Sequence, residues 1–232
     1  MTKIEEYEKK LIKEGMPKEA YAEYETLLKR VRGNFLRLQH CYTTAVQFPI
    51  KRSQEGIDLI QWALEKFPDT WFPTYSAYYN MGIIHERCSN YPAAYEAYRK
   101  AADVLSKDQL SYQRTISGNL MWMLLHIDDF KYSEQLEKYY TLFSEIDDFE
   151  KAFINNEFRI AVAEIVIYSY KGITDKAAKG ITDKAATALE RALRLSNPDI
   201  VSRIQGILDK HRVKDSLKNT PECAAFLKTI KL

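Results

Sequence analysis

The segment at residues 73–106 constrains the fold of this chain more than any other, because its apolar and small residues recur at helical spacing in two successive stretches. In the first stretch Tyr78, Met81 and His85 are three and four residues apart, so they lie on one stripe of a helix. The second stretch carries one large residue between two small ones at similar spacing: Ala94, Tyr98 and Ala101. The pattern predicts two helices that pack against each other.

The residue types in these stretches also predict how closely the two helices approach. Gly82 has no side chain, so we expect the second helix to come close there and Tyr98 to fill the space. Ser89 and Asn90 can cap the second helix, and Pro92 suits its first turn. With this arrangement the segment resembles a tetratricopeptide repeat, a helix-turn-helix unit of about 34 residues.

The same template fits most of the chain. Its second-helix pattern recurs at residues 20–27, 56–63 and 185–192, whereas residues 109–146 follow it poorly. The resemblance implies an all-α fold, a tetratricopeptide-like α-α superhelix (solenoid) of about five helix pairs in a single domain at residues 1–232. The expected units are residues 1–32, 33–70, 72–106, 109–146 and 150–198, followed by a C-terminal capping segment at residues 199–232. A non-repeating bundle of the same helices is the alternative.

An eight-residue segment occurs twice in succession, at residues 171–178 and 179–186. Either copy alone is typical of the turn between two antiparallel helices. In a continuous helix the extra residues would rotate the following segment by about 80° beyond two full turns and misdirect its apolar stripe. We therefore expect Gly172 or Gly180 to end the preceding helix. The explanations are a passive surface insertion, a sequence artefact and a partner-contacting feature.

The composition argues against several classes of protein. A net charge of +2 provides no general attraction to nucleic acid or to anionic membranes. The three cysteines lie far apart without metal-ligand or redox spacing, so we expect reduced thiols. The charged N-terminal stretch excludes a secretory signal, and the longest apolar run, at residues 160–170, is too short to span a bilayer. We therefore expect a cytoplasmic protein without a membrane segment.

Residues that carry catalysis or bind metals do not form a recognisable arrangement. His40, His85, His126 and His211 each lack a second ligand at the spacing of a helical zinc site. The resemblance places His85 at a core position, so a packed histidine is expected. The sequence has no Gly-rich phosphate loop and no nucleophile elbow. We expect a protein that is not an enzyme and that uses neither metal nor cofactor.

The resemblance implies a concave groove lined by the first helix of each repeat. The residues that it assigns to this groove are Tyr79, Asn80, Ile83, Glu86, Arg87, Asn119, Trp122, His126, Arg159 and Val166. Asn80 and Asn119 occupy equivalent places in this alignment, and their amides can donate to and accept from the backbone of an extended peptide. Trp122 can supply an anchor. The alternative is that Asn80 only bridges helices and Trp122 belongs to the core.

The sequence favours a non-enzymatic scaffold that binds a protein or an extended peptide through this groove, as an adaptor, a peptide sensor or a toxin-neutralising immunity-type protein. Asn80 matches the clamp asparagine of chaperone-binding repeats, but the flanking lysine and arginine pairs are missing, which disfavours a co-chaperone adaptor. The alternative is a nucleic-acid-associated regulator that uses basic stretches near residues 29–52 and 203–231, although the low net charge weakens it. An enzyme resting on His40, His126 and scattered carboxylates is the third hypothesis.

Overall fold

The computed structural model describes residues 2–67, 71–127, 132–145, 154–174 and 205–211, together with single positions between 184 and 194. These residues form helices and turns and contain no strand, so the expected all-α class is confirmed. The chain divides into two compact units, Met1–Gln109 (unit 1) and Leu110–Leu232 (unit 2). The tetratricopeptide-like superhelix and the single domain stay predictions.

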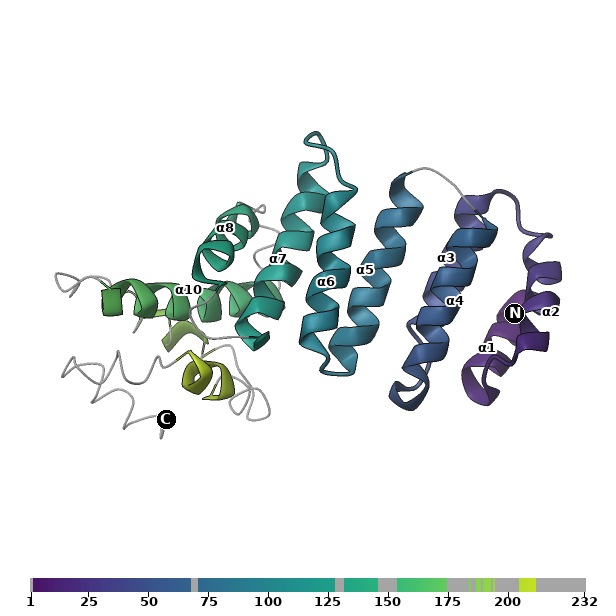
Figure 1. Cartoon of the computed structure of the whole chain (residues 1–232), viewed down its shortest axis with the longest axis horizontal. Coiled ribbons are helices and arrows are strands. Elements are labelled where there is room, and N and C mark those ends of the chain that lie inside the picture. The colour runs from purple at the N-terminus through teal and green to yellow at the C-terminus, as the bar shows by residue number, and fades with distance from the viewer. Residues whose placement is uncertain are drawn as a thin grey trace. The chain divides into compact units, whose positions relative to one another are not determined.

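Unit 1 consists of helices that follow one another in pairs. They are α1 (Lys3–Glu14), α2 (Lys18–Leu28), α3 (Asn34–Ala45), the short 3-10 helix η1 (Ile50–Arg52), α4 (Ser53–Lys66), α5 (Trp71–Arg87) and α6 (Tyr91–Asp103). Each of α1, α3 and α5 packs against the helix that follows it, and α5 also contacts α3 and α4. The helices of this unit lie side by side (Figure 1).

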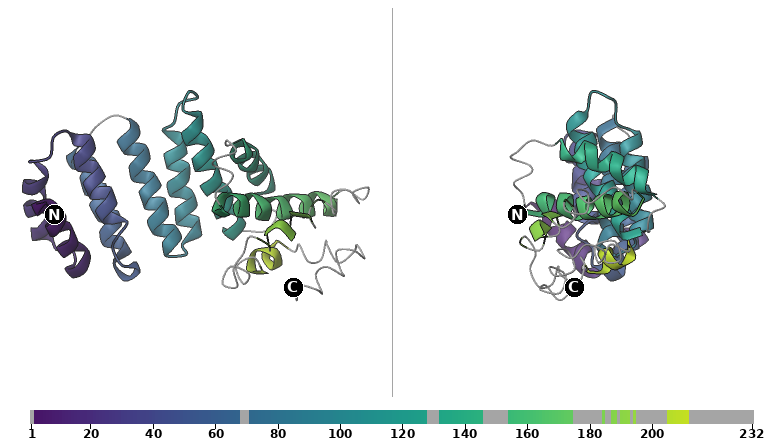
Figure 2. Two further views of the ribbon diagram at one scale, coloured as in Figure 1. Left: turned by 180° about the vertical axis from the view of Figure 1, so that it is seen from behind. Right: turned by 90° about the vertical axis from the view of Figure 1, so that its left-hand side faces the viewer.

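Unit 2 contains α7 (Leu110–Ile127), α8 (Ser133–Ser144) and α10 (Ile154–Thr174), and residues 205–210 are also helical. The contacts join α7 to α8 and α10 to both. Figure 2 shows α10 running across the direction of α7. The second half of α7, from Ile116 to Leu125, is buried on every side, so this helix forms the centre of the unit.

Short polar motifs begin two helices of unit 1. The Thr2 hydroxyl accepts from the backbone N–H of Glu5 at 3.4 Å, and the Glu5 carboxylate accepts from the backbone N–H of Thr2 at 2.7 Å. This reciprocal pair is a capping box, which satisfies donors that have no partner within the helix. At α6 the side chain of Asn90 accepts from the backbone N–H of Ala93 with Pro92 in the first turn, as expected.

The predicted close approach at Gly82 is confirmed. A Cβ atom added at this position would lie 2.4 Å from Cε1 of Tyr98, so α6 can reach α5 only because the side chain is absent. The same relationship exists in unit 2, where a Cβ at Gly118 on α7 would lie 2.5 Å from the Phe143 ring on α8. Both units therefore use one device: a glycine on one helix receives an aromatic ring from the next.

The second helices of unit 1 bury most of the positions that the repeat pattern assigns to their packing face, although Leu27 is only partly buried and Leu28 is buried in its place. The buried set is Ala20, Tyr24, Gly56, Ile60, Ala63, Ala94, Tyr98 and Ala101. Burial of a large apolar side chain such as Ile60 contributes about 1.5–3 kcal/mol, whereas the alanines and the glycine allow the helices to approach closely. Small and large residues thus alternate on the buried faces of all three second helices.

Arginines of unit 1 hold the ends of earlier helices. Arg52 donates to backbone carbonyls at the end of α1, Arg37 to carbonyls at the end of α2, and Arg87 to carbonyls that follow α3. The last carbonyls of a helix lack N–H donors from a following turn, and the negative end of the helix dipole favours a cation there. These contacts tie each helix pair to the pair before it.

The first copy of the duplicated segment begins inside α10. The helix continues past Gly172, so the expectation that this glycine ends it is wrong. Glycine within a helix costs only about 1 kcal/mol relative to alanine. Lys171, one residue earlier, forms a half-exposed ion pair with Glu137 of α8. Gly180 lies outside the described residues.

Candidate functional site

The groove residues expected on α5 are mostly engaged within unit 1. Tyr79, Asn80 and Ile83 are all half-buried. The amide of Asn80 donates to the backbone carbonyl of Ser76 at 2.7 Å, one turn earlier in the same helix. The Tyr79 ring packs against the Tyr98 ring at a centroid distance of 5.7 Å. Their role in binding a partner stays a prediction.

Two charged residues at the end of α5 make contacts with neighbouring helices. Arg87 donates to carbonyl groups after α3, as described above, although its side chain is exposed. Glu86 accepts a hydrogen bond of 2.9 Å from the buried Tyr98 hydroxyl. Both side chains therefore support the packing of unit 1. The residue spacing, which assigned them to the groove, did not predict these contacts.

Four of the expected groove residues come together in unit 2. The expectation that Asn119 and Trp122 are exposed is wrong, since they are only 7% and 8% exposed. Arg159 of α10 donates to Oδ1 of Asn119 at 3.1 Å, and its guanidinium group lies 5.5 Å from the Trp122 ring centroid. The His126 ring meets Trp122 edge to face at 4.9 Å. The cluster exists because α10 packs on α7, and it reads as a hydrogen-bonded part of the core. Val166 is buried as well.

The glycine contacts favour a different alignment from the one that pairs Asn80 with Asn119. Gly82 and Gly118 each receive an aromatic ring from the next helix, so they are the equivalent positions. Asn80 precedes its glycine, whereas Asn119 follows its own and therefore corresponds to Ile83. The pairing of a glycine with a later aromatic residue was the sequence signal that could have set this register.

A hollow that the sequence did not predict lies between α1 and α3, the first helices of two consecutive pairs. Its volume is about 380 Å³. Lys9 and Ile12 line it from α1, and Leu36, Gln39 and Thr43 line it from α3. Leu36 is 46% exposed, which is unusual for a large apolar side chain. The wall thus combines apolar, amide, hydroxyl and charged groups within reach of one ligand.

A hydrogen-bonded chain reaches the wall of this hollow, which Glu8 and His40 themselves line. The buried Tyr24 hydroxyl donates to Oε1 of Glu8 at 2.7 Å, and Nδ1 of His40 lies 2.8 Å from the same oxygen. Because an ionised carboxylate only accepts, Nδ1 of His40 is the donor. Burial, which removes water from the phenol, raises the pKa of Tyr24 and keeps it protonated. Burial likewise raises the pKa of the Cys41 thiol, so it is unreactive.

A second hollow of unit 1 lies between α4, α5 and α6, with a volume of about 530 Å³. Tyr78, Met81 and His85 line it from α5, and Gln61 and Lys100 line it from the flanking helices. His85 is half-buried, and the loss of water around its ring lowers its pKa, so it is neutral at pH 7. The histidine expected in the core therefore stands at the wall of an open hollow.

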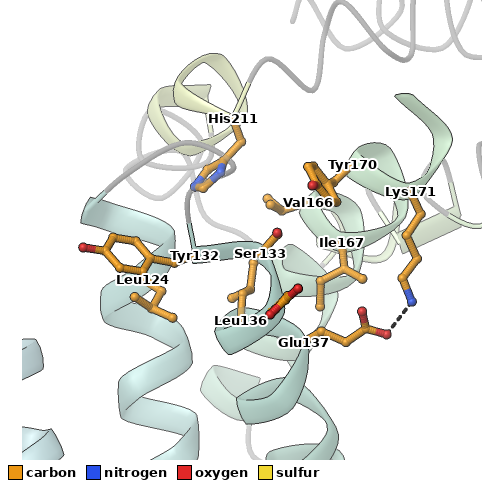
Figure 3. Close-up of a pocket in the computed structure, with 11 residues that line it drawn as sticks. Leu124, Tyr132, Ser133, Leu136, Glu137, Val166, Ile167, Tyr170, Lys171 and His211 are labelled. Carbon is orange, nitrogen blue, oxygen red and sulfur yellow. Dashed lines mark hydrogen bonds and ion pairs between the residues drawn. The ribbon is translucent and has the colours of Figure 1, made fainter. Parts of the chain in front are cut away.

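Unit 2 has a smaller cavity of about 170 Å³ between α7, α8, α10 and residues 205–211. Figure 3 shows its apolar and charged side chains together. The segment at 205–211 is fixed by hydrogen bonds to the end of α7: Lys210 donates to the carbonyl of His126, and Nε2 of His211 donates to that of Leu125 at 3.1 Å. These contacts hold His211 at the cavity.

Neither a metal-ligand cluster nor a membrane-spanning helix occurs in the part of the chain that the structure describes. That part contains no group of three or more His, Cys, Asp or Glu side chains that could hold a metal ion. Among the same residues, no helix is long and apolar enough to cross a membrane. Cys41 and Cys88 are free thiols, and Cys223 lies outside the described residues.

The basic stretch near residues 29–52 is partly occupied by structural contacts. Arg37 and Arg52 donate to helix ends, and Lys29 pairs with Glu25 at 2.9 Å. Most of the second stretch, at residues 203–231, lies outside the described residues. The nucleic-acid alternative stays a hypothesis, and fewer cations are available to it than the sequence suggested.

No family model matches this chain, and no curated protein or solved structure matches it either. The likeness to tetratricopeptide repeats therefore stays a resemblance carried by residue spacing. Function has to be argued from the surfaces and cavities described above.

Proposed function

We propose that this protein is a non-enzymatic helical-repeat scaffold that binds a protein or an extended peptide along the first helices of unit 1. The observation that carries the proposal is the hollow of about 380 Å³ between α1 and α3. Successive first helices offer a ligand a continuous surface, because equivalent positions recur from one pair to the next. The adaptor, peptide-sensor and immunity-type roles all use such a surface.

The chemistry of this hollow suits a peptide. Gln39 and Thr43 are exposed on one face of α3, and amide and hydroxyl groups can both donate to and accept from a peptide backbone. The exposed Leu36 offers apolar contact beside them. Lys9 adds a charge that can select the partner and speed its approach.

The Glu8 cluster organises the wall of this hollow. The carboxylate of Glu8 accepts from Tyr24 and His40, and Tyr24 is completely buried. Glu8 and His40 also line the hollow themselves. The cluster joins α1, α2 and α3 and so fixes the distance between the two walls of the hollow.

Site-specific photo-crosslinking tests this proposal. A photoreactive residue placed at Gln39 is expected to give a discrete adduct with one partner in cell extract. The matched control is the same residue at Gln61, an exposed glutamine on α4 that faces the other hollow of unit 1. Equal adducts at both positions, or adducts only at Gln61, would overturn the assignment of the surface.

Substitutions in the hollow provide the second arm. Leu36→Asp and the double variant Gln39→Ala/Thr43→Ala are expected to remove the Gln39 adduct while the far-ultraviolet dichroism and melting temperature stay unchanged. Asn80→Ala tests the groove position expected from the sequence. An adduct that survives every substitution would show that neither surface recognises the partner.

A further inference from the structure

The cavity of unit 2 has an apolar floor. Leu124 of α7, Leu136 of α8 and Val166 and Ile167 of α10 line it, and each is at most 6% exposed. An apolar cavity of about 150 Å³ is large enough to hold benzene. A volume of about 170 Å³ therefore accommodates a phenyl group or a branched chain of four carbons.

The mouth of the same cavity carries charges of both signs. Glu137 of α8 and Lys171 of α10 form an ion pair across it, with side chains that are 46% and 40% exposed. Glu134 adds a second carboxylate on the same helix. Figure 3 shows the Glu137–Lys171 pair beside Ile167 and Leu136 of the floor. Charged groups thus stand directly above a space that apolar side chains shape.

A ligand that occupies the apolar part of the cavity must also contact the Glu137–Lys171 ion pair. A ligand with one charge would bind one partner and leave the other to water, so it gains one charged contact and loses the existing pair. A ligand with an ammonium and a carboxylate on one carbon replaces the single pair by two, because Lys171 takes the carboxylate and the glutamates take the ammonium. Net charge at the mouth is then unchanged.

We propose that this cavity binds a free α-amino acid with a large apolar side chain. The side chain occupies the space above Leu124 and Val166, the carboxylate pairs with Lys171, and the ammonium pairs with Glu137 and Glu134. His211, which is buried and held by the Leu125 carbonyl, closes the cavity on the side of the C-terminal segment. This site is independent of the peptide surface proposed for unit 1.

Calorimetric titration of the full chain with a matched panel tests the proposal. Leucine, isoleucine or phenylalanine is expected to bind. Glycine lacks the side chain, leucinamide and isoamylamine lack the carboxylate, and 4-methylpentanoate lacks the ammonium, so each is expected to bind roughly tenfold more weakly or not at all. Methyl resonances of Leu124, Val166 and Ile167 are expected to shift on binding.

Variants locate the site and separate it from folding. Lys171→Met and Glu137→Gln, both half-exposed, are expected to reduce affinity roughly ten- to a hundredfold at unchanged melting temperature. Glu145→Gln is the control, because Glu145 pairs with Arg114 at 3.4 Å elsewhere in unit 2. Val166→Phe fills the floor and is expected to abolish binding.

Three results would overturn the proposal. They are the absence of binding by any apolar amino acid, equal binding of isoamylamine or 4-methylpentanoate, and binding that Lys171→Met and Val166→Phe both leave intact. If this proposal fails, the peptide surface proposed for unit 1 still stands, because crosslinking at Gln39 probes a different helix pair.

Discussion

Arg87 donates from Nη2 to the backbone carbonyl of Phe48 at 3.3 Å, and its Nη1 reaches the carbonyl of Val46. Both acceptors follow the end of α3, where helix carbonyls have no intrahelical donor. Arg87, which its position in the sequence assigned to a ligand groove, therefore connects α5 to α3. Removing the Arg87 side chain is therefore expected to lower the stability of unit 1, independently of any partner.

Replacing this residue gives the first prediction. Arg87→Met keeps the apolar stem but leaves the carbonyls without their donor, so we expect unit 1 to lose about 1–2 kcal/mol of stability in urea titration. Arg99→Met is the control, because Arg99 pairs only with Glu96 and Asp103 along its own exposed helix face. Equal losses in the two variants would show that Arg87 acts through general charge.

The glycine-to-ring contacts give the second prediction. In Gly82→Ala or Gly118→Ala the new methyl group meets the ring of Tyr98 or Phe143, which sits on another helix and cannot move away freely. Overpacking of this kind costs about 1–3 kcal/mol, more than the gain of about 1 kcal/mol in helix propensity.

A third glycine tests that reasoning. A Cβ at Gly206 has no atom within 4 Å, so Gly206→Ala is expected to raise stability by up to about 1 kcal/mol. Thermal unfolding followed by circular dichroism measures all three variants. Unchanged stability in Gly82→Ala would mean that the two helices can separate without cost.

The contrast between these glycines and the asparagines explains what the sequence could reveal. Gly82 and Tyr98 lie in one helix hairpin, so spacing alone predicts their contact. The partner of Asn119 is Arg159, on a helix that periodicity does not place, and its burial depends on how α10 crosses α7. The sequence could predict the helix face of Arg87 in the same way as that of Gly82. It could not predict which backbone carbonyls Arg87 contacts.

The cavities could not be predicted from the sequence, for a related reason. The hollow between α1 and α3 depends on the distance that Glu8 sets by joining Tyr24 to His40, and three separate helices supply these side chains. No local pattern encodes such a distance. The cavity of unit 2 needs His211, whose position follows from a hydrogen bond to the end of α7.

Two asparagines provide the third prediction. Asn119→Ala removes the acceptor of Arg159 inside the unit, so we expect a loss of about 1–3 kcal/mol. Asn80→Ala removes only a bond to the preceding turn of its own helix and is expected to change stability by less than about 0.5 kcal/mol. Chemical denaturation distinguishes the two. A larger loss for Asn80→Ala than for Asn119→Ala would instead support the exposed position that the sequence predicted for Asn119.

Stability is expected to fall at high pH through several tyrosines, because burial raises the pKa of Tyr24, Tyr42 and Tyr140 as well as that of one tyrosine each in α1 and α2. Burial raises the pKa of both Tyr7 and Tyr21 to about 12, with further contributions from Glu23 to the first and Asp58 to the second. An unfolded tyrosine has a pKa of about 10, so between pH 10 and 12 the unfolded chain binds fewer protons and stability declines. The contribution is complete below pH 10.

Substitution by phenylalanine isolates this fourth effect. Tyr21→Phe removes one of these titrating groups and is expected to make the decline of the unfolding free energy between pH 10 and 12 less steep. Tyr112→Phe, at an exposed position, serves as the control. Parallel curves for the wild type and Tyr21→Phe would assign the decline to other groups.

The duplicated segment gives the last prediction. Deleting residues 171–178 or residues 179–186 yields the same chain, because the copies are identical. The remaining copy restores a lysine after Tyr170, so the ion pair with Glu137 can form again and α10 keeps its last turn. Shortening a connection changes closure entropy little, and we expect a loss below about 1 kcal/mol in thermal unfolding. Lys171→Met in the full chain separates the ion pair from the change in length. A loss of about 3 kcal/mol or more on deletion would instead show that the second copy packs as part of unit 2, for example through Lys184, whose ammonium lies 5.8 Å from the Tyr168 ring.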